Sequence, residues 1–184
     1  QLVKRMLEGD RRALARLFSH LGRDVDTLFE IMSEVYHRSK SIVRAHHIGI
    51  TGPPGAGKST IVNKLISVAR AKNASVGVLA VDPTSPFTGG AVLGDRIRMQ
   101  SHSLDDGVFI RSLATRGAQG GISSTAWASA KLLEAFGKNL VIIETVGVGQ
   151  TELDIMNIAD TIVVTLVPEA GDGIQAMKAG LMEI

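Results

Sequence analysis

A glycine-rich segment between an apolar run and a helical run constrains the fold of this chain more than any other feature. Residues 52–59 read Gly-Pro-Pro-Gly-Ala-Gly-Lys-Ser and match the pattern G-x-x-x-x-G-K-[S/T]. His47 to Thr51, just before it, has the composition of a β-strand, and Lys58 to Ala71 that of a helix. A strand, a glycine loop and a helix in this order predict a nest of backbone N–H groups that binds phosphate. The alternative is a Gly/Pro turn that merely connects the two elements.

Further short apolar runs predict the other strands of a sheet. They are Val76 to Val81, Val108 to Leu113, Leu140 to Thr145 and Thr161 to Val167. Most are apolar throughout, which indicates strands covered on both faces and therefore a parallel sheet. Ser123 to Phe136 and Thr151 to Ala159 have helical composition and lie between strands. We therefore expect an α/β fold with a doubly wound, mostly parallel sheet, whose functional edge is at the C-terminal ends of the strands.

The first 45 residues differ in pattern from the rest of the chain. Their apolar residues recur at helical spacing among charged ones. Asp10 is placed to cap a helix that begins at Arg11, and Gly22 with Asp24 marks the next break. We expect an N-terminal helical extension over residues 1–45, followed by a nucleotide-binding domain over residues 46–184.

Composition excludes several classes of protein. With 45% hydrophobic and 21% charged residues among 184, the chain is expected to fold as a globule. Its net charge of +2 comes from interspersed charges rather than a basic stripe, which argues against nucleic-acid binding. Without cysteine there is no thiolate metal site, and no apolar run approaches the roughly 20 residues that span a bilayer. We expect a cytoplasmic protein with no membrane partner.

The glycine motif assigns chemistry to two of its side chains. Lys58 is expected to reach the β- and γ-phosphates of a nucleoside triphosphate, and the Ser59 hydroxyl to ligate Mg²⁺. The residues expected to bind the nucleotide are Gly52, Pro53, Pro54, Gly55, Ala56, Gly57, Lys58, Ser59, Thr60 and Gly147.

Two acidic residues lie at the ends of predicted strands, and a third lies in a loop between strands. Asp82 directly follows one strand, where a metal-bound water would sit, but it could instead be a turn-former before Pro83. Asp95 lies in a glycine-rich loop typical of a nucleotide-sensitive switch, or is an exposed acid at a helix start. Glu144 ends an apolar strand and is either a metal-side acid or a solvated one. Gly147 is a candidate backbone contact for the terminal phosphate.

Together, these motifs resemble the MeaB/ArgK family of GTPases that accompany methylmalonyl-CoA mutase. Four segments carry the resemblance besides the glycine loop: Val81-Asp82-Pro83-Thr84-Ser85, Thr88-Gly89-Gly90, Leu93-Gly94-Asp95 and Glu144-Thr145-Val146-Gly147-Val148-Gly149-Gln150. The resemblance implies a P-loop GTPase of the SIMIBI class that binds GTP and GDP with Mg²⁺. It also implies a homodimer that gates adenosylcobalamin loading of an acyl-CoA mutase and protects that enzyme.

The resemblance also assigns residues to roles. It implies Lys58, Asp82, Asp95 and Glu144 as catalytic, and Ser59, Asp82, Asp95 and Glu144 as the metal site. It implies three switches: Asp82 to Met99, Glu144 to Gln150 and Pro168 to Lys178.

The family's N-K-x-D loop, which reads guanine, and its C-terminal dimerisation helices are expected beyond Ile184, so we expect the chain to be truncated. Two other functions remain open from the residues alone. One is an ATPase or kinase of the lysine/arginine/ornithine transport type, and the other is a non-hydrolysing nucleotide-sensing scaffold.

Overall fold

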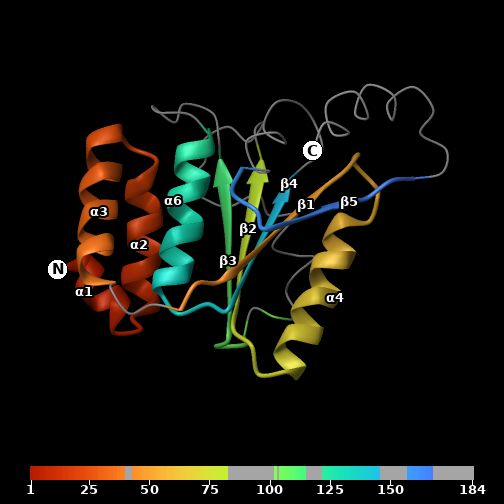
Figure 1. The fold of residues 1–184 in the computed structure, drawn as a ribbon, viewed down its shortest axis with the longest axis horizontal. Coiled ribbons are helices and arrows are strands. Elements are labelled where there is room, and N and C mark those ends of the chain that lie inside the picture. Colours follow the sequence, from red (N-terminus) through yellow and green to blue (C-terminus); the bar gives the residue numbers. More distant parts are fainter. Residues whose placement is uncertain (40–42, 83–101, 103, 115–121, 146–156, 168–184) are drawn as a thin grey trace.

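The computed structural model describes residues 1–39, 43–82, 102, 104–114, 122–145 and 157–167, whose arrangement is shown in Figure 1. The helices are α1 (Leu2–Leu7), α2 (Arg11–Leu21), α3 (Val25–Arg38), α4 (Lys58–Ala71) and α6 (Ile122–Ala135). The strands are β1 (His46–Thr51), β2 (Val76–Asp82), β3 (Val108–Ala114), β4 (Leu140–Thr145) and β5 (Thr161–Val164).

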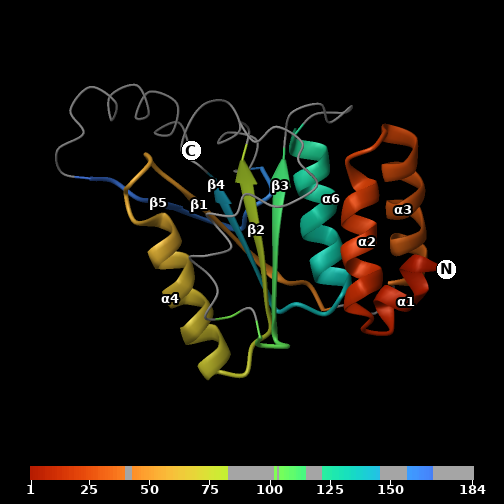
Figure 2. The same cartoon turned by 180° about the vertical axis from the view of Figure 1, so that it is seen from behind.

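The five strands form one sheet in the order β3-β2-β4-β1-β5, and every pairing in it is parallel. Helix α4 covers one face, while α6 and the three N-terminal helices lie on the other, as both views show (Figures 1 and 2). The predicted doubly wound α/β fold is therefore confirmed for the described residues. Because the strands are parallel, the loops that leave their C-terminal ends meet at one edge.

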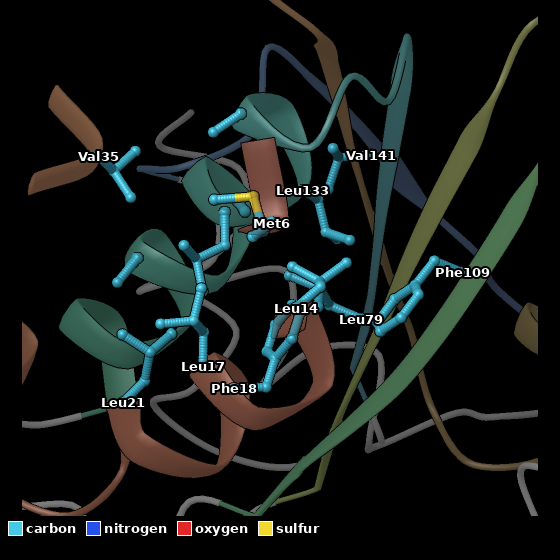
Figure 3. Close-up of a cluster of buried hydrophobic side chains, with 14 of the residues drawn as sticks. Met6, Leu14, Leu17, Phe18, Leu21, Val35, Leu79, Phe109, Leu133 and Val141 are labelled. Carbon is cyan, nitrogen blue, oxygen red and sulfur yellow. The ribbon is translucent and has the colours of Figure 1, made fainter. Parts of the chain in front are cut away.

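The apolar strands are explained by two cores, one on each face of the sheet. In β4, Val141 and Ile143 belong to the cluster beneath α6 and the N-terminal helices, part of which is shown in Figure 3. Ile142, between them, belongs to the cluster beneath α4 with Val62 and Ile66. Alternate residues thus face opposite cores, and both must be apolar.

The N-terminal helices share the first of these cores. Asp10 caps α2, its Oδ1 accepting from the amides of Arg12 and Ala13 at 2.8 and 3.1 Å, which confirms the predicted start of that helix. Phe18 of α2 stacks on Phe109 of β3, with ring centroids 5.7 Å apart. Helix α2 therefore packs on the sheet, and buried residues of all three N-terminal helices belong to the core on this face.

Two predicted element ends are wrong by more than one residue. The strand expected to reach Val167 ends at Val164, because its neighbour β1 ends at Thr51, the partner of Val164. Beyond Thr51 the chain turns into the glycine loop, so β1 has no further residues with which β5 could pair. The helix expected to reach Ala159 falls mostly outside the described residues, but 157–159 form a turn and an irregular residue rather than helix.

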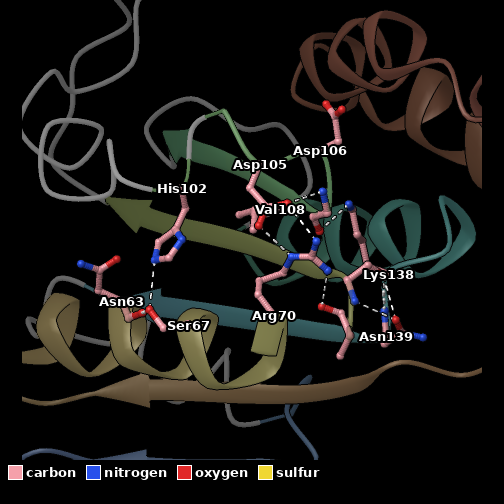
Figure 4. Close-up of polar contacts among 12 residues, drawn as sticks. Asn63, Ser67, Arg70, His102, Asp105, Asp106, Val108, Lys138 and Asn139 are labelled. Carbon is pink, nitrogen blue, oxygen red and sulfur yellow. Dashed lines mark hydrogen bonds and ion pairs between the residues drawn. The ribbon is translucent and has the colours of Figure 1, made fainter. Parts of the chain in front are cut away.

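A polar cluster lies at the edge of the sheet where β2, β3 and β4 begin, opposite their C-terminal ends (Figure 4). Arg70 at the end of α4 makes two hydrogen bonds to Asp105, at 2.8 and 3.0 Å. Lys138, which is 5% exposed, donates to the Gly107 carbonyl at 3.0 Å. The pKa of Lys138 is lowered to about 8, first because burial disfavours its charged form and then because Arg11 and Arg70 repel it.

The lowered pKa of Lys138 predicts how stability depends on pH. Between about pH 8 and the ordinary lysine value of 10.5, the unfolded chain keeps a proton that native Lys138 has released, so stability rises with pH. Lys138→Met should remove this rise and stabilise the protein by about 1 to 2 kcal/mol at pH 7. The Gly107 carbonyl keeps a hydrogen-bond donor in this variant, because it also accepts from the amide of Val76 at 2.9 Å.

Urea unfolding at pH 7 and pH 9.5 checks this expectation. The control is Lys72→Met, which removes an exposed lysine one residue beyond α4. If Lys138→Met and wild type gain the same stability between the two pH values, the buried cation is not the cause.

Candidate functional site

The glycine loop connects β1 to α4 and requires glycine at three positions for two different reasons. Gly52, Gly55 and Gly57 have φ angles of +139°, +80° and +84°, which side chains rarely allow. At Gly52 there is also no room for a side chain, because a Cβ would lie 2.2 Å from the carbonyl oxygen of Thr165. At Gly55 and Gly57 a Cβ would meet nothing within 4 Å. The motif spacing thus corresponds to a backbone that only glycine adopts easily.

Lys58 is the first residue of α4 and turns back into the loop that precedes it. Its Nζ donates to the carbonyl of Gly52 at 2.7 Å and to that of Pro53 at 2.9 Å. The residue is only 7% exposed. An ammonium group is therefore held inside the loop, at the positive end of a 14-residue helix, where both charges attract an anion.

Ser59 and Glu144 lie side by side at the C-terminal edge of the sheet. The Ser59 hydroxyl, in the first turn of α4, donates to Glu144 Oε1 at 2.6 Å. Glu144 lies two residues beyond Ile142 and is therefore on the face of β4 that α4 covers. A hydroxyl and a carboxylate are hard oxygen ligands, which fits Mg²⁺ bound next to a phosphate.

The other predicted site residues are placed less completely. Asp82 is the last residue of β2, and its backbone lies at the same edge, two residues beyond the position paired with Glu144. Asp95 and Gly147 lie outside the described residues, as do residues 83–99, 146–150 and 168–178 of the three predicted switches. The structure thus brings together the loop, Lys58, Ser59 and Glu144.

Sequence reasoning missed three buried threonines beneath the loop. Thr145 Oγ1 donates to Thr51 Oγ1 at 3.1 Å, and Thr165 Oγ1 donates to the Thr51 carbonyl at 2.9 Å. The exposed fractions of Thr145, Thr51 and Thr165 are 2%, 3% and 7%. A threonine at or just beyond the C-terminal end of three neighbouring strands was the signal that could have identified them.

In the part of the chain that the structure describes, no helix has the length and apolar character needed to cross a membrane.

Comparison with known proteins identifies relatives along the whole chain. The family profile of methylmalonyl-CoA mutase-associated GTPase MeaB matches residues 13–184. A predicted GTPase of Pyrococcus abyssi is 54% identical over 184 residues, all of this chain and 56% of that protein. The GTPase ArgK of Escherichia coli is 35% identical over 186 residues, 99% of this chain and 55% of ArgK.

Among solved structures, an LAO/AO transport system kinase superposes with a TM-score of 0.70 and 26% identity, over all of this chain and 52% of the kinase. The chain spans about half the length of the curated relatives that it matches. Because the family profile covers nearly all of the sequence, and the fold and the glycine loop agree with it, the chain belongs to the family of the methylmalonyl-CoA mutase-associated GTPase MeaB.

Proposed function

We propose that this protein is a Mg²⁺-dependent GTP hydrolase that acts as a chaperone for an adenosylcobalamin-dependent acyl-CoA mutase. The observation that carries the proposal is the buried Lys58 ammonium, held inside a glycine loop at the start of α4. This arrangement would present a cation, a helix N-terminus and loop amides to one polyphosphate.

The chain's own residues would act by position and charge. The loop amides and Lys58 would hold the phosphates and offset their charge. Ser59 and Glu144 would hold Mg²⁺, and Asp82 and Asp95 would complete its surroundings through its water ligands. The Gly147 amide would contact the terminal phosphate. Magnesium, when bound, would neutralise charge that develops on the phosphate oxygens during hydrolysis.

The mutase as partner is supported by the family to which the chain belongs, whose description names methylmalonyl-CoA mutase. The chaperone would use its nucleotide state to gate adenosylcobalamin loading and protect the mutase, and it would act as a homodimer. Guanine as the base is supported by the names of the bacterial and archaeal relatives.

A second candidate function is supported by one comparison. The solved structure with a TM-score of 0.70 is described as a transport system kinase. A kinase would use the same glycine loop and Lys58, but it would prefer ATP and pass the phosphoryl group to an acceptor other than water.

Nucleotide titrations and phosphate release separate these functions. We expect fluorescent GTP with Mg²⁺ to bind at least about 10-fold more tightly than fluorescent ATP, and methylmalonyl-CoA mutase to accelerate phosphate release. Tighter binding of ATP would favour the kinase. GTP binding without phosphate release, with or without the mutase, would instead establish a nucleotide-sensing scaffold.

A further inference from the structure

We propose that Thr165, which lies just beyond β5, is a positioning residue for phosphate binding. The inference deepens the proposed function and rests on it. Thr165 is outside the glycine motif and 114 positions from its partner Thr51 along the chain, yet it lies against the residue at which the loop begins. Its effect would reach the phosphate through Gly52 and Lys58.

Thr165 is anchored on β1 by two hydrogen bonds. Its backbone amide and its Oγ1 both donate to the carbonyl of Thr51, at 2.8 and 2.9 Å. Thr51 and Thr165 are both buried, so water does not compete strongly for these hydrogen bonds. The two bonds fix the side chain and the backbone of Thr165 against the last residue of β1.

Thr165 also approaches Gly52 closely. A Cβ built on Gly52 would lie 2.2 Å from both the carbonyl oxygen and Oγ1 of Thr165. The Gly52 backbone therefore packs closely against these two oxygens, in a conformation with φ of +139°. Removing the hydroxyl would take away one of the two groups that Gly52 packs against.

Gly52 in turn is connected to the cation. The Gly52 carbonyl accepts from Lys58 Nζ at 2.7 Å, so the position of the loop start also sets that of the ammonium. Thr145 adds a further constraint, because its hydroxyl bonds to that of Thr51. Buried threonines at or just beyond the ends of β4, β1 and β5 are thus hydrogen-bonded to one another next to the start of the loop.

Two substitutions at Thr165 test the proposal. Thr165→Val keeps the shape of the side chain and loses the hydroxyl, whereas Thr165→Ser keeps the hydroxyl and loses a methyl group. In both variants the amide of residue 165 can still donate to Thr51, so both are expected to fold. We expect Thr165→Val to raise the KM for GTP by about 5-fold with little change in kcat, and Thr165→Ser to restore the wild-type KM.

The matched control is Thr161→Val, at the other end of β5. Its hydroxyl lies 2.9 Å from His46 Nε2, far from the glycine loop in the strand register. This variant loses the same group from the start of β5, whereas Thr165 follows its end, and it should leave the KM unchanged. Urea unfolding of all three variants separates an effect on the loop from a general loss of stability.

The outcomes distinguish this inference from the proposed function. If wild type binds GTP and Thr165→Val has an unchanged KM, Thr165 has no positioning role and the proposed function stands. The inference also fails if KM rises only in proportion to lost stability, or if Thr165→Ser is as defective as Thr165→Val. If wild type binds no guanine nucleotide, the proposed function itself is wrong.

Discussion

Lys58→Ala is expected to weaken Mg²⁺–GTP binding by about 100-fold or more and to reduce hydrolysis below detection. The ammonium group is buried in the glycine loop, so its attraction for the phosphates is only weakly screened by water. Alanine removes that charge and also the two donors that hold the carbonyls of Gly52 and Pro53. Titration with fluorescent GTP and a phosphate-release assay measure the two effects.

Lys64→Ala is the matched control for this substitution. Lys64 lies on the same helix, closer to its middle, and is exposed. Its removal changes the net charge by the same amount but leaves the loop intact, so binding and hydrolysis should remain near wild type. Hydrolysis by Lys58→Ala at the wild-type rate would show that the loop is not where the nucleotide reacts.

Glu144→Gln is expected to slow hydrolysis on the order of 100-fold and to weaken its dependence on Mg²⁺. The substitution keeps the size of the side chain and a hydrogen-bond acceptor for Ser59, but it removes a buried negative charge. Because a neutral amide is a poorer ligand for a hard cation, the Mg²⁺ concentration that gives half-maximal phosphate release should rise. Binding of GDP in the absence of Mg²⁺ should change much less.

A double-mutant cycle with Ser59 tests whether the two residues act together. Since Ser59 Oγ and Glu144 Oε1 are 2.6 Å apart, the effects of Ser59→Ala and Glu144→Gln on half-maximal Mg²⁺ should not add. Ser59→Thr keeps the hydroxyl and should behave like wild type. Strictly additive effects would mean that the two side chains do not share one metal site.

The parts of the fold that depend on local sequence could be predicted closely. The helix Lys58–Ala71 and the strand Leu140–Thr145 agree with the structure to the residue. The first begins after Gly57, whose backbone conformation ends the loop, and the second begins where polar residues give way to apolar ones. The cap at Asp10 is local in the same way, because it needs only the amides of the next turn.

The parts that depend on distant partners could not be predicted. The end of β5 is set by the length of β1, which the sequence around Val164 does not contain. The hydroxyl network of Thr51, Thr145 and Thr165 joins three strands that are neighbours only in the folded sheet. For the same reason the helical periodicity of the first 45 residues predicted helices but not the stacking of Phe18 on Phe109.

At the site, the sequence predicted the loop, Lys58, Ser59 and Glu144 as functional residues, and the structure brings them together. Their proximity could be predicted because the motif is contiguous and because the strand ends of a parallel sheet converge on one edge. The roles of Lys58, Ser59 and Glu144 in binding and catalysis remain predictions, as do those of Asp82, Asp95 and Gly147.

A crystal structure of the protein with Mg²⁺ and a non-hydrolysable GTP analogue tests the central claim most directly. We predict the β- and γ-phosphates inside the loop formed by residues 52–60, with Lys58 Nζ turned from the Gly52 carbonyl toward them and Mg²⁺ on Ser59 Oγ. A nucleotide bound elsewhere on the protein, with this loop empty of phosphate, would contradict it.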